Sequence, residues 1–157
     1  MTMYPPPPQK PPEWSPHQSG PRAGFWARFA ALFIDTIVVA IIPIIVIAIG
    51  AGSSSNGFLA FGYILYLIIY VAYFVYFEGG PTGQTLGKRA LGIRVIDFNN
   101  AGPIGYGRAF IRLIGRIIAG FFCYLGYFWM LWDKEKQCWQ DKMANDVVVP
   151  VQYYPVG

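Results

Sequence analysis

The sequence predicts an all-α integral membrane protein with three transmembrane helices and a glycine-rich basic loop between the second and the third. Of its 157 residues, 55% are hydrophobic, 18% are aromatic and only 13% are charged, whereas soluble domains carry about 25% charged residues. Three apolar runs, 29–49, 58–77 and 113–132, are each long enough to cross a hydrocarbon core of roughly 30 Å. The net charge of +4 is therefore interpreted through membrane topology and not as a nucleic-acid footprint.

The chain divides into a proline-rich tail (1–21), a transmembrane domain (22–150) and a short C-terminal tail (151–157). The first tail holds eight of the thirteen prolines. Because proline fixes φ and lacks an N–H, we predict an extended, disordered segment without a core. It is either a spacer or a docking peptide for an aromatic-lined groove, and the spacer interpretation is favoured.

The segment that contains the first apolar run, 24–50, carries two charges, Arg28 and Asp35. As a helix, 29–49 rises about 31 Å, and seven residues bring the two charges nearly to the same azimuth. Arg28 can extend its long side chain to the headgroups, but Asp35 is too short to do so. A carboxylate at this depth must find a partner, face water or hold a proton. Asp35 is therefore the first candidate functional residue, and replacing it by Ala should do more damage than replacing the exposed Glu13. A kink is expected near Pro43.

The second run, 58–77, is uncharged and is predicted to span the membrane. Four tyrosines lie on one face of this helix: Tyr63, Tyr66, Tyr70 and Tyr73. They are interpreted as aromatic packing with interface anchors, or as a hydrogen-bonding lining that faces the helix of Asp35. The two interpretations can coexist.

The loop after the second run is basic and rich in glycine. Lys88, Arg89 and Arg94 are predicted to contact anionic lipid headgroups, each contributing about 1 kcal/mol. Residues 85–91 are expected to form one or two helical turns, and 91–95 a short strand. The loop does not match a phosphate-binding motif, so we expect no nucleotide site there.

The third apolar region begins with a row of arginines on one helical face, Arg108, Arg112 and Arg116. Arg112 and Arg116 either grip anionic headgroups or pair with Asp35, and both alternatives stay open. The stretch 113–132, whose one charge is Arg116 near its start, favours a single span, although 109–132 could instead form a re-entrant or interfacial element. Beyond it, the sequence predicts a brief amphipathic turn at Trp139–Met143 and a short strand at 147–149.

The positive-inside rule orients the chain. Lys10, Arg22 and Arg28 precede the first span, the first turn has no charge, and the second loop is basic. We therefore expect a multi-pass cell-membrane protein with a cytoplasmic N-terminus. A single third span places the C-terminal tail outside, whereas a re-entrant element returns it to the cytoplasm.

Three segments together resemble the RDD family of small membrane proteins. Arg28–Asp35 looks like the family's first arginine–aspartate pair, and Gln84–Val95 is similar to its characteristic loop. Trp139–Ala144 resembles its closing motif and makes Asp141 the second aspartate, with Gln140 where the family usually has histidine. The resemblance covers about residues 22–150. The resemblance implies a bacterial protein, and the proline-rich leader suggests an actinobacterial source. Most members of the family have no known function, and transport or cation/proton exchange has been proposed for some of them.

The resemblance makes Arg28, Asp35 and Asp141 a candidate charge trio. Under the three-span prediction, Arg28 and Asp141 lie on opposite faces, about 30 Å apart, and cannot pair. Asp141 is then expected to bind Lys142, Lys136 or a backbone N–H of its own turn. An ion pair between Arg28 and Asp141 would instead make 109–132 a re-entrant or surface-lying element.

Two functions remain open. The chain takes part in transport of an ion or small ligand, through an oligomer or a partner complex, or it is a non-catalytic assembly or accessory protein whose buried charges are structural. We expect no enzyme, because the sequence shows no nucleophile–base pair, no metal-ligand cluster and no phosphate loop. No cofactor, metal or nucleic acid is expected. The expected partners are the lipid bilayer, including anionic lipids, and a second copy or another membrane protein.

Overall fold

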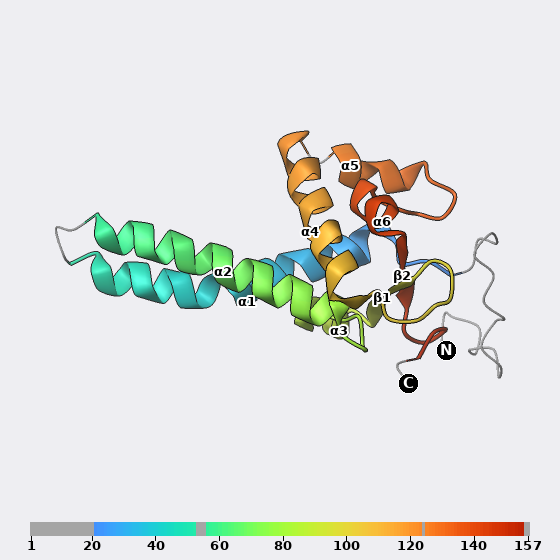
Figure 1. Ribbon diagram of the computed structural model, residues 1–157, viewed down its shortest axis with the longest axis horizontal. Helices are drawn as coiled ribbons and strands as arrows, with labels where there is room; N and C mark the ends of the chain where they lie inside the picture. The colour runs from blue at the N-terminus through green and yellow to red at the C-terminus, as the bar shows by residue number, and fades with distance from the viewer. Residues whose placement is uncertain (1–20, 53–55, 124, 156–157) are drawn as a thin grey trace, which may run out of the picture.

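The computed structural model describes residues 21–52, 56–123 and 125–155, so the predicted disorder of residues 1–20 lies outside it. Most of the described chain is helical, as the sequence predicts. The two longest helices, α1 (Phe25–Gly50) and α2 (Gly57–Gly79), lie side by side and form a long hairpin (Figure 1). At about 1.5 Å per residue these helices are about 39 and 35 Å long, so both can cross a bilayer.

The far part of the hairpin presents apolar side chains outward. Ile44, Ile45, Leu59 and Ile64 are all more than half exposed, which suits lipid and not water. Gly62 lets the two helices approach, because a Cβ there would meet the side chain of Ile47 at 2.5 Å. The hairpin therefore has the surface expected of a membrane anchor.

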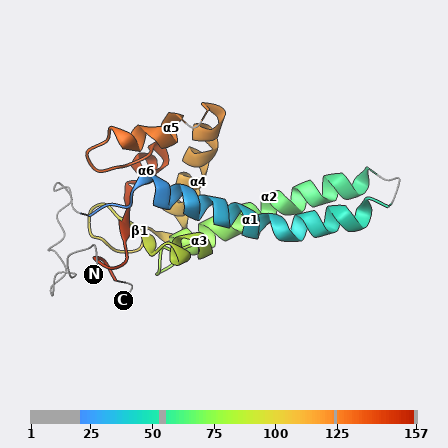
Figure 2. The ribbon, with the colours of Figure 1, turned by 180° about the vertical axis from the view of Figure 1, so that it is seen from behind.

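The near part of the hairpin carries the rest of the described chain. We call this region the polar end; it is formed around the start of α1 and the end of α2 by α3 (Leu86–Ala90), β1 (Ile93–Asp97), α4 (Gly105–Phe121), α6 (Trp139–Ala144) and β2 (Asp146–Pro150). The described segments before α1 and after β2 also lie at this end (Figures 1 and 2). The first and last described segments also bond directly, since Ala23 N–H donates to the Val148 carbonyl at 2.9 Å.

The two short strands pair with each other in an antiparallel sheet. Ile93 lies opposite Pro150, and Asp97 lies opposite Asp146. Strands were expected at 91–95 and 147–149, and these positions fall in or beside β1 and β2. Their pairing, which joins segments about fifty residues apart, was not predicted. It places the C-terminal segment against the loop after α2.

The third apolar region is not one continuous helix. Helix α4 ends at Phe121, and the following α5 (Leu125–Phe128) and 3-10 turn η1 (Trp129–Leu131) are bent from it by 112°. The single span predicted over 113–132 is therefore not confirmed and stays a prediction. By length and composition, the described residues contain two helices that can cross a membrane, or up to three if the bent pair is counted as one span.

Helix α4 is apolar on its exposed face and charged on its buried face. Ile111, Ile114 and Ile117 are exposed, whereas Arg112 and Arg116 are buried. A water-soluble helix has the opposite arrangement. The buried arginines are held by carboxylates of the polar end, which explains why this helix turns its charges inward.

Candidate functional site

Arg28 and Asp141 form a buried ion pair, with Arg28 Nη1 lying 2.5 Å from Asp141 Oδ2. Arg28 also donates to the carbonyl oxygens of Ala23 (3.2 Å) and Lys136 (2.8 Å). The expectation that these two residues could not pair is wrong, because the C-terminal segment returns to the start of α1. The expected backbone partner of Asp141 is also present: Cys138 N–H donates to its carboxylate at 3.0 Å.

Arg112 joins the ends of three other elements. Its Nε lies 3.1 Å from Glu78 Oε2 at the end of α2, and its Nη1 contacts the carboxylates of Asp141 in α6 and Asp146 in β2. The residue is only 2% exposed. Since a planar guanidinium can serve several carboxylates at once, this one side chain holds α2, α4, α6 and β2 together.

Glu78 is the acceptor shared by three cations. In addition to Arg112, it binds Lys88 through Oε1, and Arg116 Nη2 lies 2.8 Å from the same oxygen. Glu78 is completely buried. The Arg116 guanidinium also lies over the Phe74 ring, 4.3 Å from its centroid, a cation–π contact that holds the side chain from the other side.

These contacts define one group, which we call the charge cluster. Its members are Arg28, Glu78, Lys88, Arg112, Arg116, Asp141 and Asp146. It contains four cations and three carboxylates, all of them buried. Groups this buried persist only when they are paired, and each member of the cluster has at least one partner of opposite charge.

The two aspartates that share Arg112 titrate in opposite directions. Burial alone would raise the pKa of Asp141, but Arg112 and Arg28 outweigh it and hold that pKa below its ordinary value. Burial raises the pKa of Asp146 well above its ordinary value, and the nearby carboxylates of Asp141 and Glu78 add to this against the attraction of Arg112. The pair therefore favours one ionised and one protonated carboxyl.

Asp35 is buried next to the charge cluster but binds neutral groups. Its carboxylate accepts hydrogen bonds from Tyr73 Oη (2.7 Å), Thr85 Oγ1 (2.6 Å) and Gly87 N–H (2.7 Å). No cation lies within ion-pair distance of it among the described residues. The suggestion that Arg112 or Arg116 pairs with Asp35 is therefore wrong, and Arg28 is not its ion-pair partner either.

The contact with Asp35 depends on a glycine at position 87. A Cβ there would lie 2.1 Å from the Ala31 carbonyl oxygen and 2.8 Å from Asp35 Oδ1. No side chain fits at that distance, so glycine allows α3 to lie directly on α1. Thr85, the residue before α3, also accepts from Lys88 N–H at 3.3 Å, so this one turn positions both an Asp35 donor and a cluster cation.

The tyrosine face of α2 has both predicted roles. Tyr73 hydrogen-bonds to Asp35, as in the hydrogen-bonding interpretation. Tyr66, Tyr70 and Phe74 pack ring against ring, with centroids 5.7 and 4.8 Å apart, as in the packing interpretation. Tyr63 lies 63% exposed further along the hairpin.

The three residues expected at lipid headgroups have different surroundings. Lys88 is buried against Glu78, and Arg94 is buried with its guanidinium donating to the Pro155 (2.8 Å) and Pro81 (3.4 Å) carbonyls. These two positions do not fit a headgroup contact. Arg89 is exposed and keeps that role as a prediction.

A small cavity of about 20 Å³ lies between Asp35 and the charge cluster. All four cations of the cluster line it, together with Asp35, Tyr127 and Gln140. Among the described residues, no group of three or more His, Cys, Asp or Glu residues could hold a metal ion. The charged lining of the cavity is therefore mainly cationic.

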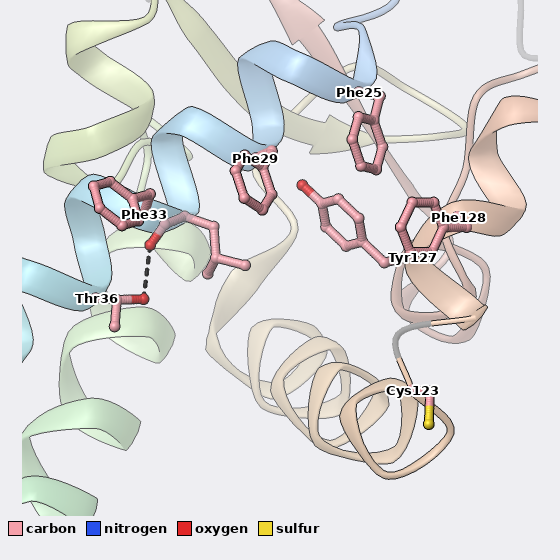
Figure 3. A pocket seen from close by; sticks show the side chains of 8 residues that line it. Phe25, Phe29, Phe33, Thr36, Cys123, Tyr127 and Phe128 are labelled. Carbon is pink, nitrogen blue, oxygen red and sulfur yellow. Dashed lines mark hydrogen bonds between the residues drawn. The ribbon is translucent and has the colours of Figure 1, made fainter.

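A larger apolar groove of about 260 Å³ lies between α1 and α5. Phe25, Phe29 and Phe33 line it from α1, and Tyr127 and Phe128 face them from α5 (Figure 3). Tyr127 also lines the small cavity, so this residue borders both spaces. The groove suits hydrocarbon chains and not a charged ligand.

The family model that describes the RDD family matches residues 22–145, most of the chain. The chain belongs to the RDD family. The resemblance that Arg28, Asp35 and Asp141 suggested is thereby confirmed. In this RDD protein, Arg28 and Asp141 meet within the charge cluster, and Asp35 lies beside it against the loop that follows α2.

Curated relatives of this RDD protein include two mycobacterial proteins. A proline-rich antigen homolog of Mycobacterium tuberculosis is 32% identical over 84 residues, covering 52% of this chain and 35% of the relative. The proline-rich antigen of Mycobacterium leprae is 29% identical over 96 residues, covering 60% and 39%. The match therefore spans little more than a third of these relatives. The uncharacterized protein YxaI of Bacillus subtilis is 27% identical over 135 residues, covering 73% and 88%. No solved structure matches the chain.

Sequence reasoning missed Glu78 and Asp146 as members of the site. Glu78 directly follows a twenty-residue uncharged run and precedes a loop, so it looked like an ordinary boundary residue. One signal was available: it is a single acid that follows a predicted span, and three arginines occupy one face of the next helix. Asp146 carried no comparable signal, because only the pairing of β1 with β2 brings it to Arg112.

Proposed function

We propose that this chain is a non-catalytic membrane assembly module. The hairpin of α1 and α2 anchors it in the cell membrane, and the polar end presents a rigid surface at one membrane face to a second copy or another membrane protein. One observation carries this proposal: Arg112 contacts carboxylates of α2, α6 and β2 at once. Such an arrangement fixes the relative positions of elements far apart in the sequence.

Membrane depth supports this assignment. Measured from the far end of the hairpin at about 1.5 Å per residue, Asp35 lies about 22 Å along α1, and Arg28 and Glu78 lie about 32–33 Å along their helices. With a hydrocarbon core of roughly 30 Å, the charge cluster falls at the headgroup boundary and Asp35 lies somewhat inside it. The cluster is therefore placed where a protein surface meets water and lipid together.

The two faces of α4 support a topology with two membrane-spanning helices. The outward apolar face of α4 and its inward arginines suit a helix that lies in the interface, with its apolar face a few ångströms into the acyl region. The bent pair of α4 and α5 is then an interfacial or re-entrant element. By the positive-inside rule, both termini lie on the cytoplasmic side.

Anionic lipid remains part of the proposal through Arg89. Its side chain is exposed on α3, close to the predicted boundary. A basic residue near an anionic surface contributes about 1 kcal/mol and is screened by salt. Binding to anionic vesicles that weakens in Arg89→Gln and at high salt would support this contact.

The assembly proposal is tested by the state of the protein in native membranes. We expect wild-type chain, extracted in mild detergent, to migrate as a stable complex larger than one copy. The variant Arg112→Met should still insert but lose that complex, whereas the control Arg89→Met, altered at an exposed arginine, should keep it. A wild-type chain that is monomeric in these extracts would contradict the proposal.

Transport is the second candidate, and Asp35 is the observation that favours it. This carboxylate lies inside the hydrocarbon region, binds neutral donors and borders a small cavity. Vesicles that contain only this protein distinguish the two functions. The assembly proposal expects no proton or cation flux above that of protein-free vesicles, whereas a flux that Asp35→Asn abolishes would favour transport.

A further inference from the structure

The small cavity beside Asp35 contains buried polar atoms without partners. Arg116 Nε and Nη1, Tyr127 Oη and Gln140 Oε1 have no hydrogen-bond partner among the described residues. All three side chains line the cavity, and Arg116 is only 8% exposed. Buried donors of a guanidinium are costly to leave unsatisfied. Something that accepts hydrogen bonds is therefore expected in this space.

The charge of the surroundings favours an anion. Four cations line the cavity, Arg28, Lys88, Arg112 and Arg116, and Asp35 lines it beside them. Three neutral groups already donate hydrogen bonds to Asp35, so its oxygens do not satisfy the free donors of Arg116. With Asp35 counted beside Glu78, Asp141 and Asp146, protonation of Asp146, whose pKa burial raises, leaves four cations against three carboxylates, an excess of one positive charge (4 − 3 = 1).

The volume limits the size of the ligand. About 20 Å³ accommodates one small ion or one water molecule. Phosphate, sulfate, a lipid headgroup or a nucleotide needs more room. The available donors are Nε and Nη1 of Arg116 and the hydroxyl of Tyr127, which suit a spherical acceptor. A half-turn of the Gln140 amide would add its NH2 group.

We propose that this cavity binds a single monovalent anion of halide size, such as chloride. Arg116 and Tyr127 donate hydrogen bonds to it, and the four cations of the cluster supply the favourable potential. The anion balances the excess charge of the cluster and satisfies its unpartnered donors. This site goes beyond the proposed assembly function and does not depend on it.

A salt series on the purified full-length protein tests the site. Thermal unfolding in detergent is measured at constant ionic strength in gluconate, sulfate, chloride and bromide. We expect chloride and bromide to raise Tm by about 2–4 °C over gluconate, with saturation, and sulfate to have no such effect. Equal Tm values in chloride and gluconate would overturn the proposal.

A second variant places a carboxylate in the cavity. Gln140→Glu supplies a fixed negative charge beside Arg116, so its Tm in gluconate should rise towards the chloride value and its halide dependence should disappear. The control Gln152→Glu, at an exposed position, should keep the full halide response. An unchanged halide dependence in Gln140→Glu would overturn the proposal.

Bromide also allows direct detection in the wild-type protein, which decides the matter if Gln140→Glu does not fold. Crystals grown in bromide should show an anomalous peak within hydrogen-bond distance of Arg116 Nε and Nη1. A water molecule at that position, without anomalous signal, would overturn the proposal.

Discussion

The two ends of the hairpin differ in which side chains they expose, although the same two helices form both ends. In the far part, α1 and α2 expose Ile44 and Leu59 and carry no charge. In the near part, they bury Arg28 and Glu78 completely or nearly so. The difference follows from the surroundings: lipid solvates apolar side chains and leaves charges unsatisfied, so at the polar end each charge of the cluster is satisfied by another part of the protein.

Helix α4 combines an exposed apolar face with a buried charged face. It exposes Ile114 to the surroundings and turns Arg112 and Arg116 inward. This arrangement is stable because the carboxylates of Glu78, Asp141 and Asp146 lie on the inner side. The comparison teaches that hydropathy alone predicts the hairpin well, whereas the structure of the polar end depends on which charged side chains pair with each other.

The largest expected effect comes from removing the cation that three carboxylates share. Arg112→Met keeps an apolar side chain of similar length but leaves Glu78, Asp141 and Asp146 short of a partner. Breaking a buried ion pair in this way costs about 3–5 kcal/mol. We expect a loss of this size in the free energy of unfolding, measured by SDS titration in detergent micelles.

The control is Arg89→Met on the exposed surface of α3, which should change stability by no more than about 0.5 kcal/mol. Equal losses in the two variants would show that the charge cluster does not stabilise the polar end.

A smaller loss is expected where α3 touches α1. Gly87→Ala introduces a Cβ 2.1 Å from the Ala31 carbonyl, so the two helices must separate and the hydrogen bond to Asp35 must lengthen. Overpacking of this kind costs about 1–3 kcal/mol. The same unfolding titration measures it, and Gly107→Ala, where a Cβ meets nothing within 4 Å, is the matched control and should not destabilise.

Loss of one hydrogen bond to Asp35 should have a still smaller effect. Tyr73→Phe removes the hydroxyl that donates to Asp35 and accepts from Leu86 N–H, which should cost about 1 kcal/mol. Tyr63→Phe, on the same helix but in the far part of the hairpin, should leave stability unchanged. A matching loss in Tyr63→Phe would remove the distinction between the two ends.

The smallest expected effect is on how the free energy of unfolding depends on pH. Asp146, with its pKa raised in the folded state, stabilises fully below its unfolded value of about 3.9, and this contribution is lost as pH rises through its folded pKa. Asp141, with a lowered pKa, stabilises above about 3.9 and loses this as pH falls through its folded pKa. Unfolding measured across pH should therefore show Asp146→Asn declining less steeply than wild type as pH rises. A steeper decline in the variant would contradict this assignment.

The sequence predicts the membrane-spanning hairpin better than it predicts the polar end. The apolar runs predict α1 and α2 because crossing lipid requires little more than length and absence of charge. The helical spacing of Arg28 and Asp35 predicts that they share one face of α1, and the tyrosine face of α2 indicates one partner, Tyr73. The other partners come from α6, α3 and the loops before them, which no local pattern indicates. The stretch 113–132 looked like a span because its neighbouring arginines could extend to headgroups. In the structure Arg112 and Arg116 instead turn inward to Glu78 and its neighbours.

The central claim is that Arg28 and Asp141 meet at one membrane face, so that both ends of the chain lie on the same side. Single cysteines at Gln152 and Asn56, in a Cys123→Ser background that leaves only the buried Cys138, test it with a membrane-impermeant maleimide. We expect Asn56→Cys to be labelled from outside intact cells and Gln152→Cys to be labelled only after the cells are opened. Labelling of Gln152→Cys from outside intact cells would contradict the account.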